Sequence, residues 1–398
     1  MQYLTQYLEK YGALDFNEKP FNDVDAVIFS QLIYNEMNGI LESADSVTIS
    51  EAAVKFYEHN SDADIDALLD VASRAARLLT LCSETKRFGK VLMKNYINNI
   101  NDAIDKQICA ANYYLCDGSI MVAFRGTDAT VTGFKESAML AYMFPVPAQI
   151  EALHYFQESA MLHDGAVRVC GHSKGGNLAI YAAVNCSNSL QRKIESVYAF
   201  DAPGFPEWFF DGYDYKQIRD KINIINPQCS IVGRALFMEK EPCIVRSDAK
   251  RSRQHSIATW LISDDRFETA ECYDADSDKL GAYLNDLVKT IGDEDLDSFY
   301  GALEKTAEEM GVYNFYDLKN VDTNLLMIFI DSIQTLNPDQ KARLRALAKK
   351  VMTDFAKDYV SGAATKAKTY VKNVTNKLPF RHKDEPENDE EKIETDGE

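Results

Sequence analysis

The spacing of apolar residues changes twice along this chain, which divides it into three stretches. Over roughly the first hundred residues, apolar positions recur every three or four residues, which predicts amphipathic helices at 23–39, 48–57 and 65–82. From residue 106, short β-branched or aromatic runs alternate with helical patterns. From about residue 264 the three- and four-residue spacing returns. This order predicts an α/β fold with a mainly parallel sheet, an N-terminal helical segment and a C-terminal helical extension.

The middle stretch contains the predicted strands. The first two, with the turn Cys116-Asp117-Gly118-Ser119 between them, form a hairpin. Helical patterns at 131–143 and 148–162 then separate the second strand from the third. The predicted strands are 106–115, 120–124, 166–170, 197–200, 221–225 and 242–246.

We therefore predict four regions. Residues 1–105 form a helical segment that packs on the core, and residues 106–265 form the α/β core itself. Residues 266–380 form a C-terminal helical region. Residues 381–398 form a tail that is acidic from Asp384 onward. Ile393 is its one large apolar residue, and the tail is expected to be disordered.

The sequence Gly171-His172-Ser173-Lys174-Gly175 follows a predicted strand and precedes a predicted helix, and it fits the G-x-S-x-G nucleophile elbow. A serine at such a turn has a strained backbone that lifts its hydroxyl clear of the sheet. Glycines on either side remove Cβ atoms that would clash at a tight turn. Ser173 is therefore the candidate nucleophile; the alternative is a Gly-rich helix start with an inert serine.

A serine nucleophile needs a base, and His255 is the best of the six histidines. It follows the last predicted strand, where a loop can return it to Ser173. His172 occupies the variable position of the elbow and is expected to support the turn. The alternative for His255 is a helix-capping histidine at the surface.

The base in turn needs a group that orients it, and Asp201 is the favoured acid. It ends the strand at 197–200, on the sheet edge where ligands bind in α/β folds, and the order Ser173, Asp201, His255 is that of α/β hydrolases. Asp201 could instead cap the Pro-Gly turn that follows. Asp248, or a dyad with a backbone or Asn226 partner, remain open alternatives.

The oxyanion of an acyl-transfer reaction needs hydrogen-bond donors. One is the backbone N–H of Lys174, directly after the candidate nucleophile. The other is Thr127, in the sequence Phe-Arg-Gly-Thr after the buried strand at 120–124, through its N–H and its hydroxyl. A plain turn that carries an ion pair is the alternative for residues 125–128.

Composition excludes several classes of function. The chain has 398 residues and a formal net charge of −19, which disfavours nucleic-acid binding. Its eight cysteines form no C-x-x-C pair, so neither a metal site nor a disulfide framework is expected. The N-terminus has no pattern of a signal peptide, and no apolar run is long enough to span a bilayer. A cytoplasmic location is the default expectation.

Three segments, AFRGTD, TGFKES and CGHSKGGNLA, resemble the pattern of class 3 (fungal-type) lipases. The chain is more similar still to a bacterial lipase-like family of unknown function, over roughly residues 15–265, including EKPFNDVDAVIFSQLIYNE. The resemblance implies an α/β-hydrolase fold with Ser173 as nucleophile, His255 as base, and Thr127 with Lys174 as oxyanion hole. Class 3 lipases carry their aspartate in the segment that matches 227–231, where this chain has no carboxylate, and Lys174 replaces their usual small apolar residue.

We therefore expect a serine hydrolase that cleaves a carboxylic ester, with lipid esters among the candidate substrates, without a cofactor. The alternative is a catalytically weak or inactive hydrolase fold that binds a partner through its helical ends. Residues 138–150 are either a lid over an acyl site or a core helix with a Pro turn. The basic helix near the C-terminus, with Lys366, Lys368, Lys372 and Lys377, packs on the body or, less favoured, contacts a membrane surface. The sequence does not give the oligomeric state.

Overall fold

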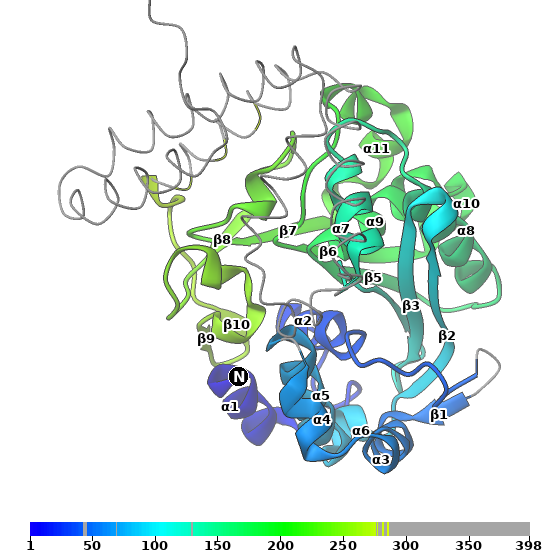
Figure 1. Ribbon diagram of the computed structural model, residues 1–398, viewed down its shortest axis with the longest axis vertical. Coiled ribbons are helices and arrows are strands. Elements are labelled where there is room, and N and C mark those ends of the chain that lie inside the picture. Colours follow the sequence, from blue (N-terminus) through cyan, green and yellow to red (C-terminus); the bar gives the residue numbers. More distant parts are fainter. Residues whose placement is uncertain are drawn as a thin grey trace, which may run out of the picture.

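The computed structural model describes residues 1–275 without 43–45, 69 and 129, together with Ser277, Gly281 and Asn285. An eight-stranded sheet runs through the molecule with its strands in chain order, and a small sheet of β9 and β10 lies beside it (Figure 1). The pairings from β1 to β4 are antiparallel and those from β4 to β8 are parallel. The strands are β1 Ser46–Thr48, β2 Leu92–Asn101, β3 Lys106–Tyr114, β4 Ile120–Phe124, β5 Val167–His172, β6 Ile194–Phe200, β7 Ile222–Pro227, β8 Cys243–Val245, β9 Ile262–Ser263 and β10 Arg266–Phe267.

Strands occur beyond the predicted core 106–265 on both sides, in the main sheet before it and in the small sheet after it. β1 and β2 lie within the segment 1–105 that was expected to be helical, and β2 pairs with β3 in a bulged antiparallel register. β10 begins at Arg266, so the β9–β10 pair crosses the expected boundary at 265. The predicted helix 65–82 is present as two helices, α4 Asp62–Ala67 and α5 Asp70–Ser83.

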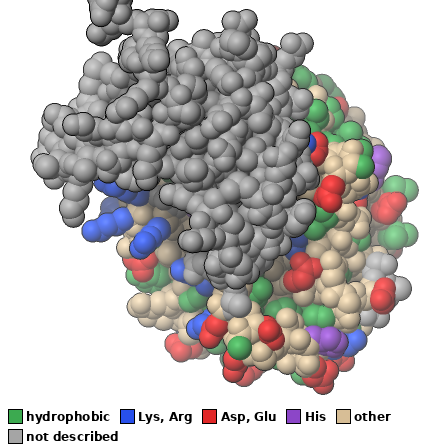
Figure 2. Space-filling model, viewed as in Figure 1, with side chains coloured by type: hydrophobic (Ala, Val, Ile, Leu, Met, Phe, Trp, Pro, Cys, Tyr) green, Lys and Arg blue, Asp and Glu red, His purple; other side chains and the backbone are tan. Residues whose placement is uncertain are grey.

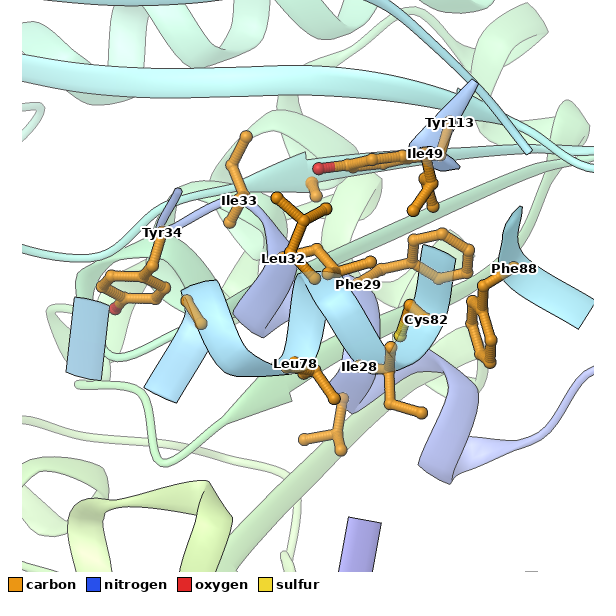
Figure 3. Packing of buried hydrophobic residues seen from close by; sticks show 14 of the residues in the cluster. Ile28, Phe29, Leu32, Ile33, Tyr34, Ile49, Leu78, Cys82, Phe88 and Tyr113 are labelled. Carbon is orange, nitrogen blue, oxygen red and sulfur yellow. The ribbon is translucent and has the colours of Figure 1, made fainter. Parts of the chain in front are cut away.

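The N-terminal helices cover one face of the sheet. Alternate residues of β3 point to this face, so Cys109, Ala111 and Tyr113 join the core formed with α1–α6. Figure 3 shows Phe29 of α2 beside Tyr113, and their ring centroids are 5.0 Å apart. These helices are α1 Gln2–Tyr11, α2 Asp23–Leu32, α3 Ile49–His59, α4 Asp62–Ala67, α5 Asp70–Ser83 and α6 Lys86–Gly89.

A second set of helices covers the opposite face. The other residues of β3, Ile108 and Ala110, point here and pack with α8, α9, α10 and α11. α9 is buried from Lys174 to Val184, which fixes its N-terminus firmly at the edge of the sheet. The helices are α7 Val131–Met139, α8 Pro147–Met161, α9 Lys174–Asn185, α10 Asn188–Lys193 and α11 Tyr213–Ile218. The 3₁₀ turns are η1 Asp102–Ile104, η2 Glu207–Asp211, η3 Arg219–Lys221, η4 Val232–Arg234, η5 Arg251–His255 and η6 Ile257–Thr259.

The segment 138–150 contains the end of α7, a turn and the start of α8. Met139, Leu140 and Val146 are buried together, whereas Met143 and Ile150 are exposed. Phe144 stacks edge-on against Trp208, with centroids 5.1 Å apart. The segment thus contains packed helix ends around a Pro turn, and whether it acts as a lid remains a prediction.

Several sequence expectations fall outside the described residues. These are most of the C-terminal helical region, the basic helix around Lys366–Lys377 and the acidic tail from 381. Within the part that the structure describes, no helix is long and apolar enough to cross a bilayer.

Candidate active site

Ser173 lies at the turn between β5 and α9, with φ 57° and ψ −133°. A non-glycine residue held in this region stores on the order of 1–3 kcal/mol of strain, and such strain is concentrated at functional sites. A Cβ on Gly171 would lie 2.2 Å from the backbone of Gly175, and one on Gly175 would lie 2.2 Å from the carbonyl oxygen of Phe124. Both glycines are therefore required by the close approach of α9 to β5 and β4.

The structure brings Asp201 and His255 together. Asp201 follows β6 directly and His255 ends η5, 54 residues later, yet His255 Nδ1 lies 2.6 Å from Asp201 Oδ2. The carboxylate is fully buried, whereas the imidazole is one-third exposed. A hydrogen bond to Nδ1 fixes the orientation of the ring and leaves Nε2 without a hydrogen-bond partner among the described residues.

The buried carboxylate of Asp201 is held by further donors. Its Oδ1 accepts hydrogen bonds from the hydroxyl of Ser230 and from the backbone N–H of Gly233, the latter at 3.0 Å. Burial opposes ionisation, but the hydrogen bonds from His255 and Ser230 and the charges nearby outweigh it, so the pKa of Asp201 lies below its ordinary value. The segment 227–231, where class 3 lipases carry their aspartate, thus supplies a hydroxyl donor to Asp201.

The two alternative partners of the base lie elsewhere. Asn226 Nδ2 donates to the hydroxyl of Tyr273 at 2.7 Å and to the carbonyl of Gly233. Asp248 lies in the loop before His255, and its backbone N–H donates to the carbonyl oxygen of Thr259. Neither side chain forms a hydrogen bond to the His255 ring within the described residues.

Ser173 and His255 do not form a hydrogen bond to one another in the described part of the chain. Catalytic hydrogen bonds are often long in substrate-free enzymes and tighten when substrate binds, so this geometry is compatible with a nucleophile–base pair. The rings of His172 and His255 have centroids 4.4 Å apart, which places the base beside the residue that precedes Ser173.

Two backbone N–H groups lie where an oxyanion hole is expected. Lys174 is the first residue of α9, and the N–H groups in the first turn of a helix have no partner within the helix. Thr127 follows β4, next to the turn at Gly126 whose Cβ would lie 3.1 Å from the Ser173 Cβ. Thr127 Oγ1 lies 2.5 Å from Ser137 Oγ, which itself donates to the Gly133 carbonyl, so the Thr127 hydroxyl is engaged as a donor. Its backbone N–H is the better candidate.

The side chain of Lys174 forms a buried ion pair that the sequence did not indicate. Its Nζ donates to Glu136 Oε2 at 2.8 Å and to two oxygens of Gln107 at 2.7 Å. Glu136 also accepts from the N–H groups of Gln107 and Ala148. Burial lowers the pKa of Lys174, and Glu136 opposes the shift. These bonds connect the start of α9 to β3, α7 and α8. In the sequence, the only indication was the unusual lysine directly after the serine; neither Glu136 nor Gln107 could be identified as its partner.

His172 supports the site from behind the elbow. Its Nε2 lies 2.9 Å from the carbonyl oxygen of His255, and its Nδ1 lies 3.2 Å from the hydroxyl of Tyr34. Since a carbonyl oxygen only accepts, Nε2 carries the proton and Nδ1 accepts from Tyr34. Burial first, and the His255 ring second, lower the pKa of His172 to about 3. His172 is therefore a neutral ring that holds the backbone of His255.

A cavity of about 1280 Å³ borders on the two imidazoles. Its walls come from α2, from α5 and from the loop between β8 and β9, and Ser173 lies outside the lining. Arg74, Lys250, Arg251 and Arg253 face this cavity together with Asp248. Among the described residues, no group of three His, Cys, Asp or Glu side chains is placed to hold a metal ion.

Solved lipase structures are similar to the chain at low levels. A crystal structure of M37 lipase is 16% identical, with a TM-score of 0.35 over 54% of this chain and 70% of that one. The lipase of Rhizomucor miehei, in its propeptide complex, is 14% identical with a TM-score of 0.34, over 70% and 79%. The lipase of Rhizopus microsporus var. chinensis is 14% identical with a TM-score of 0.30, over 52% and 78%. Curated protein sequences give no match.

The α/β-hydrolase-like fold expected from the sequence is confirmed by the parallel run from β4 to β8 with helices on both faces. A family model described as Mbeg1-like matches residues 82–304. The match contains the elbow, Asp201, His255 and the turn at Thr127, and it spans more than half of the chain. The protein therefore belongs to the Mbeg1-like family, which is lipase-like, as the sequence resemblance predicted.

Proposed function

We propose that this protein is a serine hydrolase that cleaves a carboxylic ester through an acyl-enzyme on Ser173. His255 is the general base, Asp201 orients it, and the backbone N–H groups of Thr127 and Lys174 form the oxyanion hole. The reaction needs no metal or organic cofactor, because each of its steps is a proton transfer or an acyl transfer between groups of the chain and the substrate.

The steps follow from these roles. Ser173 Oγ attacks the ester carbonyl while His255 Nε2 takes its proton, and the resulting oxyanion is stabilised by the two N–H groups. The tetrahedral intermediate collapses, and the alcohol leaves with the proton from His255. Water then attacks the acyl-enzyme, with His255 again as base, and releases the carboxylic acid and free Ser173.

The observation that carries the proposal is that a strained serine and an oriented histidine lie at the same edge of the sheet. Ser173 has a positive φ of 57°, and His255 Nδ1 lies 2.6 Å from the buried Asp201. Buried ion pairs that only stabilise a fold enclose both partners, whereas the imidazole here is one-third exposed. That combination supports hydrolysis over a purely structural role.

A fluorophosphonate probe tests the proposal directly. The full-length protein should be labelled on Ser173, and it should hydrolyse short-chain nitrophenyl esters. Ser173→Ala should abolish labelling and reduce hydrolysis at least about 10³-fold, because the nucleophile is lost. Ser187→Ala, at an exposed serine before α10, is the matched control and should behave as wild type.

The alternative is a hydrolase fold that binds a partner without catalysis. The same experiment distinguishes this alternative from the proposed hydrolase. A folded protein that neither reacts with the probe nor turns over any nitrophenyl ester would contradict the proposal and favour the binding role. The acyl chain preference follows from a series of nitrophenyl esters of increasing length.

A further inference from the structure

The cavity beside His255 has a charge opposite to that of the chain. The chain as a whole carries 62 acidic and 43 basic residues, yet among the described residues four cations and one carboxylate line this cavity. Lys250 and Arg253 are exposed, and neither forms an ion pair with a described residue. Figure 2 shows Lys and Arg side chains gathered on the side of the molecule where β8, β9 and β10 lie. A concave wall with an excess of positive groups focuses a field that attracts an anion.

The basic wall of the cavity, formed by Lys250, Arg251 and Arg253, is held in place by buried neighbours. Gln254 is buried, its amide donates to the carbonyl of Ala249, and its oxygen accepts from the N–H of Cys229 at 2.8 Å. The buried indole of Trp260 donates to the carbonyl of Gln254 at 2.8 Å. From the opposite wall, Arg74 of α5 donates to Ser256 Oγ at 3.1 Å. The cations therefore project from anchored elements rather than from a free loop, which lowers the entropy cost of binding.

The position of the cavity indicates which portion of an ester substrate would contact it. In the proposed mechanism His255 Nε2 protonates the departing alcohol, so the alcohol lies against the His255 ring. The acyl group, by contrast, is bonded to Ser173, which lies outside the lining of the cavity. The part of a substrate that reaches the basic wall is thus its alcohol portion.

We propose that the alcohol portion of the substrate carries a phosphate group, which is bound by Arg74, Lys250, Arg251 and Arg253. The substrate class is then an acyl ester of a phosphorylated alcohol, such as a lysophospholipid with a phosphate monoester headgroup. Guanidinium groups match phosphate oxygens in paired, charge-assisted hydrogen bonds, and three of the four cations are arginines. The inference rests on the proposed function, because it assigns the leaving group of that reaction.

The test compares two esters that differ only in the phosphate. Hexanoyl glycerol 3-phosphate and monohexanoyl glycerol are assayed with the full-length protein below their aggregation concentrations, so that no charged surface forms. The phosphate ester should have a kcat/KM about 10-fold or more higher, which corresponds to one charge-assisted hydrogen bond. In the double variant Lys250→Gln/Arg253→Gln the ratio of the two kcat/KM values should fall at least about 5-fold.

The matched control removes a cation from the same helix without touching the cavity. Arg77 of α5 is exposed and pairs with Asp66 at 3.0 Å, and Arg77→Gln should keep the wild-type ratio. Glycerol 3-phosphate should inhibit competitively and more strongly than inorganic phosphate, because the alcohol carbons also contact the cavity.

The outcomes separate this inference from the function on which it rests. Equal kcat/KM values for the two esters, or an unchanged ratio in the double variant, overturn the inference and leave the hydrolase intact. Inorganic phosphate that inhibits as strongly as glycerol 3-phosphate also overturns it, because the cavity then takes a free anion. If neither ester is hydrolysed and Ser173 is not labelled, both proposals fail.

Discussion

Two of the buried carboxylates among the described residues, Asp25 and Asp201, are paired with their partners in opposite ways. In the helical layer, Asp25 of α2 pairs with Arg87 of α6, and both side chains are fully buried. At the sheet edge, Asp201 is equally buried, but its partner His255 is one-third exposed. The first pair is closed on all sides, and the second is open on one.

The closed pair uses its hydrogen-bonding groups fully. Arg87 Nε and Nη2 lie 2.7 and 2.5 Å from the two oxygens of Asp25, and Tyr7 donates to the same carboxylate. The remaining N–H groups of Arg87 donate to backbone carbonyls of the segment 14–20. In the open pair, by contrast, His255 Nε2 makes no hydrogen bond within the described residues.

The difference separates a stabilising pair from a reactive one. A buried pair with every donor used has nothing left with which to bind a substrate, and breaking it exposes an uncompensated charge. A buried acid that holds one nitrogen of an exposed imidazole leaves the other nitrogen available for proton transfer. The comparison predicts that changes to the open pair alter activity, and that changes to the closed pair alter stability.

The largest effect is expected at the open pair. Asp201→Asn should reduce kcat/KM for a nitrophenyl ester on the order of 10³–10⁴-fold, because an amide donor at Nδ1 selects the wrong tautomer of His255. Steady-state kinetics on protein whose fold is checked by circular dichroism measures this. Asp220→Asn, at an exposed carboxylate, is the control and should match wild type. An active Asp201→Asn enzyme would contradict the assignment of Asp201.

The closed pair should produce the reverse result. Arg87→Met leaves the Asp25 carboxylate buried without its partner, so the free energy of unfolding should fall by about 3–5 kcal/mol. Urea denaturation measures the loss. Fluorophosphonate labelling per folded molecule should stay at the wild-type rate. A variant that keeps its stability but loses labelling would break the distinction between the two pairs.

A smaller effect is expected from pH, through the ring behind the elbow. The pKa of His172 is lowered from 6.5 to about 3, so the unfolded chain takes up a proton near pH 6.5 while the folded protein does not. The stability that neutral His172 provides is therefore complete above pH 6.5 and is lost as the pH falls toward 3. Between pH 7 and pH 5 this loss amounts to about 2 kcal/mol.

His172→Gln removes the titrating ring but keeps an amide donor. Urea denaturation at pH 7 and pH 5 should show that the variant loses about 2 kcal/mol less than wild type over this interval. Equal losses in the two proteins would show that His172 takes up its proton in the folded state as readily as in the unfolded state.

The smallest effect is expected at Tyr34, whose hydroxyl donates to His172 Nδ1. Tyr34→Phe removes that donor inside the core and should lower the free energy of unfolding by about 1 kcal/mol. Tyr181→Phe is the matched control, because the Tyr181 hydroxyl makes no hydrogen bond among the described residues. Equal losses in the two variants would show that the hydroxyl contributes nothing through His172.

The parallel half of the fold was accessible from the sequence, and part of the antiparallel half was not. β4 coincides with the predicted strand 120–124, because all five of its residues are apolar and buried. β2 was missed: its sequence Leu-Met-Lys-Asn-Tyr-Ile-Asn-Asn-Ile-Asn is rich in Asn and largely exposed. Such a strand is defined by its pairing with β3 rather than by its own periodicity.

The candidate site shows the same limit. The elbow was predictable because a turn of this kind imposes residue types at fixed spacing. The Lys174–Glu136 pair was not, since its two partners lie 38 residues apart and meet only through the packing of α7 on β3. The contact between His172 and the backbone of His255 could not be predicted either, because every residue has a backbone carbonyl and the sequence does not distinguish the one that accepts.

That last contact has a consequence for how the protein tolerates change. Ser173 and His255 are separated by a long stretch of chain. His172, the neighbour of the serine, nevertheless forms a hydrogen bond from its Nε2 to the carbonyl oxygen of His255, 83 positions away, at 2.9 Å. Their spacing is then set by one covalent link and one hydrogen bond, so a shift of the turn carries the imidazole with it. Lengthening the surface connections between them, such as the turns around 211–213 or 239–241, should leave the two groups in register.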